Sequence, residues 1–254
     1  VAEMKSNYKK LKLDCLVTLG GNGTHKTANL LSEEGLNVIG LPKTIDNDIW
    51  GTEVTFGFHT AVDIATEVID RIHTTATSHG RVMVIEIMGN KAGWLPLYSG
   101  IAGGVARAVN DRAKQNKSFS IIAVAEGAMD KKEAEMKRKE RASARAAEGF
   151  TTISARIAKQ IEQKTGIETR AVVPGHIQRG GSPSAYDRVL ATRFGVHAAQ
   201  LIRDGVYGVT VALKGDEVVH NPLREVAGIT KFVPPEHQMV QIARQIGIRF
   251  GDEK

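Results

Sequence analysis

The sequence predicts an α/β fold made of two doubly wound, mainly parallel sheets of the Rossmann-like type. Six short apolar runs, nearly all ending at glycine or proline, have the composition of buried strands. Segments with helical periodicity separate these runs. Buried strands that alternate with helices are typical of a parallel sheet covered by helices on both faces. The chain length of 254 residues suits about two such domains.

The predicted strands set the order of the elements. The six runs read, in order, DCLVTLGG, NVIGLP, RVMVIEIMG, FSIIAVAEG, RAVVPG and GVTVALKG. Helical periodicity is clearest in residues 60–76 and 151–166, the second of which stops at a glycine. A further helix is predicted to begin at Val105, directly after Gly104, where the alternation requires a strand. We therefore expect an unusual connection there, or segments missing before Val1 and between Gly104 and Val105.

Composition is that of an ordinary globular protein with an anionic partner. Hydrophobic residues make up 42% and charged residues 24% of the chain, and the net charge is +6. Much of the excess lies in residues 131–149 and near the amino terminus, where charges alternate with apolar residues as on a solvated helix face. Aromatic residues are only 5%, so a phosphorylated metabolite is favoured as the partner over nucleic acid.

The sequence predicts a cytoplasmic protein without a membrane segment. It has no run of about 18 apolar residues and no signal-peptide pattern. Its single cysteine, Cys15, lies in an apolar run, which favours a small core residue over a nucleophile.

The turn after the first predicted strand is a candidate phosphate site. In sheets of this kind, ligands bind beyond the carboxyl ends of the strands. The first strand ends in GGNGT, Gly20 to Thr24, immediately before a helix. Glycines let the backbone approach a phosphate closely, and a helix N-terminus offers amide donors. A plain strand-to-helix turn explains the pattern about equally well. The candidate cofactor-binding residues here are Gly21, Asn22, Gly23 and Thr24.

The turn after the second predicted strand, TIDND, holds two carboxylates two residues apart. Asp46 and Asp48 repel each other unless a positive group lies between them or their roles differ. Beside a bound phosphate, one aspartate can accept the proton of an attacking hydroxyl and the other can hold Mg²⁺. Thr44 can hydrogen-bond the transferred group, and Lys43 can neutralise its oxygens. The competing interpretation is an Asx-rich turn that caps a helix.

Several positive side chains lie near strand ends. Arg81 and Arg170 open predicted strands, and GHIQRGG adds His176 and Arg179. Arginines beside histidine and glycine are typical of a sugar-phosphate clamp, although a lone arginine of this kind more often forms a surface salt bridge. Glu126 ends the run IIAVAEG, where it can accept a hydrogen bond from a sugar hydroxyl.

Taken together, these motifs resemble the phosphofructokinase family. GGNGT, GLPKTIDNDI, SHGRVMVIEIMGNKAG, AVAEG and ETRAVVPGHIQRGGSPSAYDR occur in the family's order and at its spacing, over nearly the whole chain. TIDND and GHIQRGG together are highly specific. The resemblance implies the phosphofructokinase fold and transfer of a phosphoryl group from Mg·ATP or pyrophosphate to the 1-hydroxyl of fructose 6-phosphate, a glycolytic reaction of allosteric enzymes.

The resemblance also implies roles for the candidate residues. Asp46 would be the general base, Thr44 a hydrogen-bond donor to the transition state, and Asp48 a carboxylate associated with Mg²⁺. Asn22 stands where most members have an aspartate that is also associated with Mg²⁺. The residues implied to contact the sugar within the subunit are Met88, Gly89, Glu126, His176 and Arg179.

An oligomer and a division into two domains are implied as well. Arg81 and Arg170 would grip the 6-phosphate from a neighbouring subunit, which implies a homo-oligomer with shared active sites, a tetramer or a dimer. The phosphoryl-donor domain is expected to comprise residues 1–57 and 178–228. The fructose 6-phosphate domain is expected to comprise residues 58–177 and 229–254.

Three departures from the family pattern concern the donor and regulation. Asn22 replaces the aspartate, and Asn90 replaces an arginine that ATP-type bacterial members often carry. The family's first strand and nucleotide loop are absent, as is the strand after Gly104, in a region that some members use for effectors. Gly23 resembles the ATP-using members, because a small residue leaves room for a nucleotide, whereas Lys43 is shared with pyrophosphate users. We therefore expect ATP as the donor, with a pyrophosphate-dependent enzyme and a non-catalytic regulatory subunit as alternatives.

Overall fold

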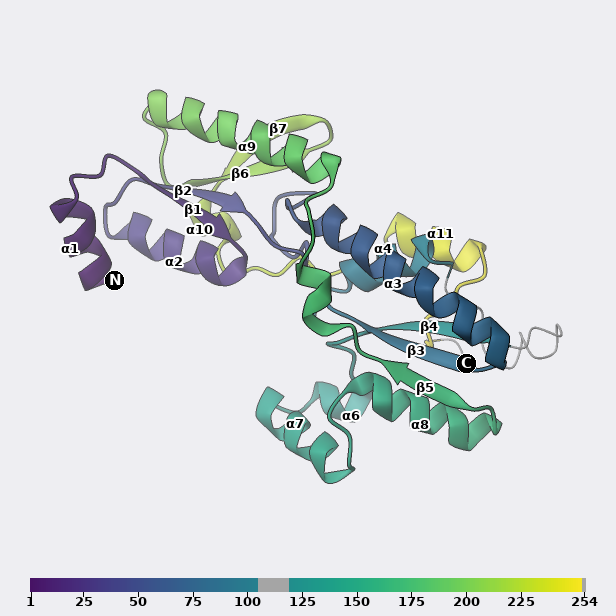
Figure 1. The fold of residues 1–254 in the computed structure, drawn as a ribbon. Coiled ribbons are helices and arrows are strands. Elements are labelled where there is room, and N and C mark those ends of the chain that lie inside the picture. Colours follow the sequence, from purple (N-terminus) through teal and green to yellow (C-terminus); the bar gives the residue numbers. More distant parts are fainter. Residues whose placement is uncertain (105–118, 253–254) are drawn as a thin grey trace. The chain divides into compact units, whose positions relative to one another are not determined.

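The computed structural model describes residues 1–104 and 119–252, so the helix predicted to begin at Val105 lies outside the described residues (Figure 1). The chain divides into two compact units. Unit 1 comprises Val1–Thr60 and Ser182–Phe232, and unit 2 comprises Ala61–Gly181 and Val233–Lys254. Each unit contains one sheet. Which of them binds the phosphoryl donor stays a prediction, as do the functional bounds given above.

Unit 1 is built on a four-stranded sheet with the order β1-β2-β6-β7. The first three strands are parallel, and β7 runs antiparallel to β6. All five residues of β2 are buried, as expected of a strand covered on both faces. The elements are β1 (Leu16–Gly20), β2 (Val38–Pro42), β6 (Val209–Lys214), β7 (Glu217–Pro222), α1 (Ala2–Lys10), α2 (Asn22–Glu33), α9 (Ala185–Arg203) and α10 (Leu223–Val226).

The side chains of β2 alternate between two hydrophobic clusters. Val38 packs with Leu31 of α2, whereas Ile39 and Leu41 pack with a cluster that includes Phe194 of α9. Figure 1 accordingly shows α2 and α9 on opposite faces of the sheet. The predicted doubly wound arrangement is therefore confirmed in this unit.

Unit 2 is built on a three-stranded, fully parallel sheet with the order β4-β3-β5. Val82 and Val84 of β3 pack with Ile153 and Ala158 of α8 on one face. The strands are β3 (Val82–Ile87), β4 (Ser120–Ala125) and β5 (Thr169–Val172). The helices are α3 (Phe58–His79), whose first residues belong to unit 1, α4 (Trp94–Ala102), α6 (Lys131–Ala134), α7 (Arg138–Ala147), α8 (Ile153–Thr165), the 3₁₀ helix η1 (Gly175–Arg179) and α11 (Gln238–Gln245).

All six predicted strands are formed, and the structure adds β7, which was not predicted from the sequence. Lys214 pairs with Glu217, which leaves a two-residue turn at Gly215 and Asp216, with Gly215 at φ 57°. A glycine-aspartate pair between two β-prone runs is a hairpin signal that could have identified this strand. The hairpin places the antiparallel strand at the edge of an otherwise parallel sheet.

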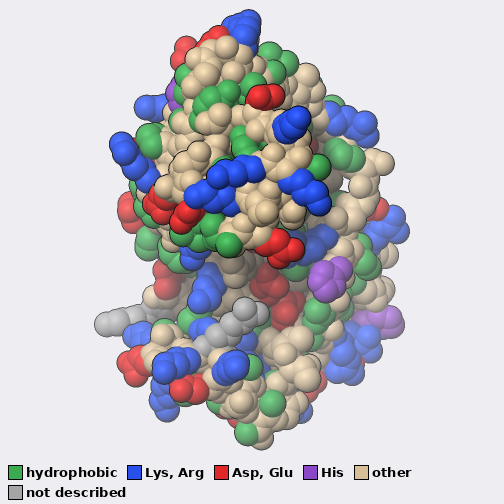
Figure 2. All heavy atoms as spheres, turned by 90° about the vertical axis from the view of Figure 1, so that its left-hand side faces the viewer, with side chains coloured by type: hydrophobic (Ala, Val, Ile, Leu, Met, Phe, Trp, Pro, Cys, Tyr) green, Lys and Arg blue, Asp and Glu red, His purple; other side chains and the backbone are tan. Residues whose placement is uncertain are grey.

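The predicted charged helical segment, residues 131–149, forms two short helices, α6 and α7, and most of its residues are exposed. On the face that Figure 2 shows, lysine and arginine side chains are dispersed among aspartate and glutamate. Cys15 is partly buried and packs against the apolar cluster of β2 and α9, at the margin of the core. Within residues 1–104 and 119–252, no helix is long and apolar enough to cross a membrane.

Candidate active site

The carboxyl ends of β1 and β2 lie side by side in unit 1. The two strands pair in parallel with Gly20 opposite Pro42, and the backbone N–H of Lys43 donates to the carbonyl of Gly20 at 3.0 Å. The two turns that follow these strands, GGNGT and KTIDND, therefore start from the same edge of the sheet.

The glycine-rich turn is short and leads directly into α2. Gly20 ends β1, Gly21 is the N-cap residue, and the helix begins at Asn22. A Cβ at Gly20 would lie 2.1 Å from Thr24 Oγ1, so only glycine fits there. A Cβ at Gly23 would meet no described atom within 4 Å. The first turn of α2 thus has open space beside Gly23, and the N-terminus of a helix is a common place for anions to bind.

The TIDND turn is held by Asn47, which the sequence analysis did not single out. Its backbone adopts a left-handed conformation with φ 51°, which asparagine tolerates better than most residues. The side chain is 3% exposed, donates to the carbonyl of Glu53 at 3.1 Å and accepts from the backbone N–H of Thr55 at 3.0 Å. Thr44 Oγ1 accepts from the backbone N–H of Asp46 at 3.1 Å. The residue between the two acids therefore fixes the path of the turn.

Asn22 and Asp48 join the two turns directly. Asn22 Nδ2 donates to Asp48 Oδ2 at 2.9 Å and to the Asp48 carbonyl at 3.1 Å. The remaining side-chain oxygens, Asn22 Oδ1 and Asp48 Oδ1, are buried and have no hydrogen-bond partner in the part of the chain that the structure describes. Two such oxygen acceptors suit a hard divalent cation.

Unit 1 supplies few protein ligands for such a cation. No group of three or more His, Cys, Asp or Glu side chains suitable for a metal occurs among residues 1–104 and 119–252. Mg²⁺ is commonly held by one or two protein oxygens together with waters and substrate phosphates. Asn22 and Asp48 fit that mode of binding.

Lys231 places a half-buried positive charge near Asp48. Its Nζ donates to the carbonyls of Thr52 and Glu53, both at 2.8 Å, and its backbone N–H donates to the carbonyl of Asp48 at 2.9 Å. Burial lowers the pKa of Lys231 to about 8, while the carboxylates of Asp48 and Glu53 oppose that shift. No motif marks Lys231, which lies 179 positions after Thr52 in the sequence.

In unit 2, the residues predicted to contact the sugar within one subunit follow the strands at the carboxyl edge of the sheet. Met88 and Gly89 follow β3, and Glu126 follows β4. Glu126 Oε1 accepts from the backbone N–H of Gly89 at 3.2 Å and of Asn90 at 2.7 Å. The carboxylate of Glu126 therefore lies next to the turn after β3 and fixes its conformation.

The predicted residues His176 and Arg179 lie in η1, just after β5, and both are exposed. Gln178, between them, is buried and accepts from the backbone N–H of Met88 at 3.0 Å, while its amide donates to the carbonyl of Gly175 at 3.2 Å. Gln178 was missed by the sequence analysis. Its side chain connects the turn after β3 to η1, so these two segments share one edge.

Arg81 and Arg170 lie at the opposite, amino edge of the same sheet. Arg81 directly precedes β3, and Arg170 is the second residue of β5. Both guanidinium groups bond to Glu168, at 2.7 Å and 2.5 Å. The bond from Arg81 is the main reason that the pKa of Glu168 is lowered. At about 3.3 Å per strand residue, Arg81 lies roughly 20 Å from Met88.

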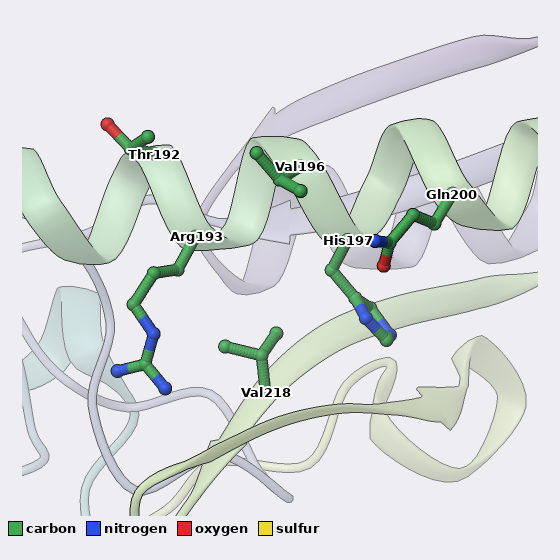
Figure 3. Close-up of a pocket in the computed structure, with 6 residues that line it drawn as sticks. All are labelled: Thr192, Arg193, Val196, His197, Gln200 and Val218. Carbon is green, nitrogen blue, oxygen red and sulfur yellow. The ribbon is translucent and has the colours of Figure 1, made fainter.

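A cavity of about 310 Å³ between α9 and β7 contains none of the predicted site residues. Figure 3 shows Arg193 and His197 of α9 extending toward Val218 of β7. A ring nitrogen of His197 lies 3.3 Å from one of His220, and burial lowers the pKa of His197. This cavity is separate from the residues that join the turns after β1 and β2.

The chain is a doubly wound α/β protein in which a glycine-rich helix N-terminus and a turn with two aspartates meet at the strand ends. A family model described as Phosphofructokinase matches residues 1–202. The ATP-dependent 6-phosphofructokinase of Spirochaeta thermophila is 57% identical over 97% of this chain and 71% of its own length. The ATP-dependent 6-phosphofructokinase 3 of Bacteroides thetaiotaomicron is 48% identical over 96% of this chain and 72% of its own. The chain belongs to the phosphofructokinase family.

Solved structures agree with this assignment. Phosphofructokinase from Saccharomyces cerevisiae matches with a TM-score of 0.72 and 27% identity, over 86% of this chain and 33% of that longer chain. The pyrophosphate-dependent phosphofructokinase from Marinobacter aquaeolei matches with a TM-score of 0.70 and 21% identity, over 94% and 68% of the two chains. The second likeness concerns the fold alone. The phosphofructokinase fold predicted from the sequence is thereby confirmed.

Asn47→Ala is expected to lower the free energy of unfolding by about 2–4 kcal/mol, because it removes two buried hydrogen bonds and leaves a left-handed backbone without asparagine. Asn47→Gly is expected to lower it less, since glycine adopts φ 51° freely. Urea denaturation followed by circular dichroism measures both. Equal losses would assign the whole effect to the hydrogen bonds, and no loss in either variant would contradict the role of Asn47.

Proposed function

We propose that this chain is an ATP-dependent 6-phosphofructokinase, which transfers the γ-phosphoryl group of ATP to the 1-hydroxyl of fructose 6-phosphate in glycolysis. The observation that carries the proposal is the contact between Asn22 and Asp48, which joins a glycine-rich helix N-terminus to the turn with two aspartates. The names of the two curated relatives support the same activity. A cytoplasmic location stays a prediction from the sequence.

The chemistry in unit 1 is a proton transfer coupled to phosphoryl transfer. Asp46 accepts the proton of the 1-hydroxyl, the hydroxyl oxygen bonds to the γ-phosphorus, and the bond to the leaving ADP oxygen breaks. Thr44 donates a hydrogen bond to the transferred group, and Lys43, whose side chain is exposed, neutralises its oxygens. Asn47 holds Asp46 and Asp48 in position through the bonds described above.

Asn22 and Asp48 are the residues that would hold Mg²⁺. When bound, Mg²⁺ neutralises negative charge on the phosphoryl oxygens of the donor. Their buried oxygens without donors support this assignment. Because an amide replaces one carboxylate, the protein itself contributes a single negative charge from this pair, and the phosphates of the donor supply the rest.

We further propose that a second copy of the chain completes the sugar site. Glu126, Met88 and Gly89, with His176 and Arg179, bind the sugar from one edge of the unit 2 sheet. Arg81 and Arg170 lie at the other edge, so they cannot reach the same ligand within one chain. A homo-oligomer, a dimer or a tetramer, would bring the arginines of one copy to the 6-phosphate bound by another.

The first experiment measures fructose 1,6-bisphosphate formation from fructose 6-phosphate and Mg²⁺, with ATP and with pyrophosphate in parallel. Turnover with ATP and little with pyrophosphate is expected, because open space beside Gly23 leaves room for a nucleotide. Turnover with pyrophosphate and none with ATP would show that Lys43, and not Gly23, determines which phosphoryl donor is used. Sugar-phosphate binding without turnover by either donor would identify a regulatory subunit instead.

Asp46→Ser is expected to lower kcat by roughly 10²- to 10⁴-fold while fructose 6-phosphate still binds, because the variant removes the base but not the sugar contacts. Calorimetric titration with the sugar phosphate checks that binding is retained. A kcat close to that of the wild type would exclude Asp46 as the base. Asp204→Ser, at an exposed residue after α9, is the matched control.

Gly23→Asp is expected to raise KM for ATP by about 100-fold, because a carboxylate in the open space would repel the phosphates of ATP. Gly23→Asn has nearly the same size without the charge, so it separates repulsion from crowding. A weaker effect in the asparagine variant supports repulsion, and equal effects would support crowding. An unchanged KM in both variants would contradict the placement of ATP beside Gly23.

A further inference from the structure

His25 is a buried titratable residue to which the mechanism above assigns no role. It lies in the first turns of α2 and is 0% exposed. Its Nδ1 is 3.0 Å from the carbonyl oxygen of Gly21, and its Nε2 is 2.9 Å from Thr210 Oγ1 on β6. The backbone N–H of His25 also donates to the Gly21 carbonyl, at 3.1 Å. One residue therefore binds the N-cap carbonyl twice and connects it to the sheet.

The partners of His25 fix its tautomer. The carbonyl of Gly21 can only accept, so Nδ1 must carry a hydrogen. Burial lowers the pKa of His25, which favours the neutral ring, so Nε2 carries no hydrogen and accepts from the hydroxyl of Thr210. The single hydrogen of that hydroxyl is then directed to Nε2 and not to the carbonyl oxygen of Gly40, which lies 3.1 Å away. Both ring nitrogens are satisfied in this state.

A glycine in β2, the strand next to β6, leaves space for the contact between His25 and Thr210. A Cβ at Gly40 of β2 would lie 3.2 Å from His25 Nε2 and 3.0 Å from Thr210 Oγ1. Gly40 therefore allows the imidazole and the hydroxyl to meet across β2. His25, Gly40 and Thr210 come from three elements, and a side chain at Gly40 would crowd the contact between the other two.

We propose that His25 is a positioning residue that fixes the peptide between Gly21 and Asn22, and thereby holds the Asn22 side chain against Asp48. Gly21 has no side chain to restrict its backbone, and it bears no side-chain cap for α2. The two hydrogen bonds from His25 supply that restriction from inside the helix. The ligand affected is Mg·ATP, and this identification rests on the proposed function.

The test compares two replacements of His25 by calorimetric titration of the full-length chain with Mg·ATP. His25→Asn retains a donor near the position of Nδ1, whereas His25→Leu retains bulk without a donor. The leucine variant is expected to bind Mg·ATP about tenfold more weakly, as is typical when a group that orients a metal ligand is removed. The asparagine variant is expected to lose clearly less. KM for fructose 6-phosphate should remain that of the wild type in both.

Controls separate positioning from a general loss of structure. His220→Ala, at an exposed residue of β7 in the same unit, should leave binding unchanged. Thermal unfolding is measured for every variant. A folded leucine variant with wild-type Mg·ATP affinity would overturn the proposal, as would equal losses in the leucine and asparagine variants. If the wild-type chain binds no Mg·ATP, the proposed function itself is wrong. In that case Mg·ATP is also not the ligand that His25 affects.

A spectroscopic arm tests the geometry without any ligand. The imidazole ¹⁵N spectrum of wild-type protein should show a hydrogen on Nδ1 and none on Nε2 at about neutral pH. Thr210→Val should perturb the Nε2 signal, and Thr210→Ser, which keeps the hydroxyl, should preserve it. A hydrogen on Nε2 instead of Nδ1 would contradict the donation to Gly21 and overturn the proposal.

Discussion

The parallel register of β1 and β2 is the constraint on which the rest of the site depends. Gly20 pairs with Pro42, so both strands end at the same edge, and the turns that follow them must pack against each other. That packing brings the N-terminus of α2 to the turn with two aspartates, where Asn22 bonds to Asp48. A shift of one residue in this pairing would turn the alternating side chains of β2 to the wrong clusters. The hydrophobic cores on the two faces therefore also fix the alignment of the polar turns.

Charge around the aspartates is balanced from a distant part of the chain. Asp48 is 3% exposed, and a buried carboxylate is costly without a compensating group. Lys231 supplies that charge in part, and its ammonium at the same time ties the carbonyls of Thr52 and Glu53. Two carboxylates in one short turn are thus tolerated for two reasons. Asn47 separates them along the backbone, and a half-buried lysine, Lys231, lies close to Asp48.

The sequence was sufficient for the fold and for the turns that carry the site, because both depend on local patterns. Buried runs marked six strands, and the residues after them marked the loops. The residues that could not be predicted from the sequence act through contacts with residues far away in the chain. Gln178, Lys231 and His25 act through partners 90, 179 and 185 positions away, and no local spacing encodes such contacts. Asn47 was visible between the acids, but its role depends on a left-handed backbone that only the structure reveals.

At the amino edge of the unit 2 sheet, Glu168 would compete with any other anion for Arg81 and Arg170. Its carboxylate holds both Arg81 and Arg170, so in this chain the two guanidinium groups already have an anion. A phosphate that arrives there does not enter an empty cationic pocket. If these arginines bind the 6-phosphate as proposed, that phosphate must exchange with a carboxylate, offering a charge of about −1.5 to −2 in place of −1. Selectivity among ligands would then depend on the difference in binding free energy between the ligand anion and the Glu168 carboxylate. A monoanion of similar size carries the same charge as Glu168, so it would gain little binding free energy by displacing it.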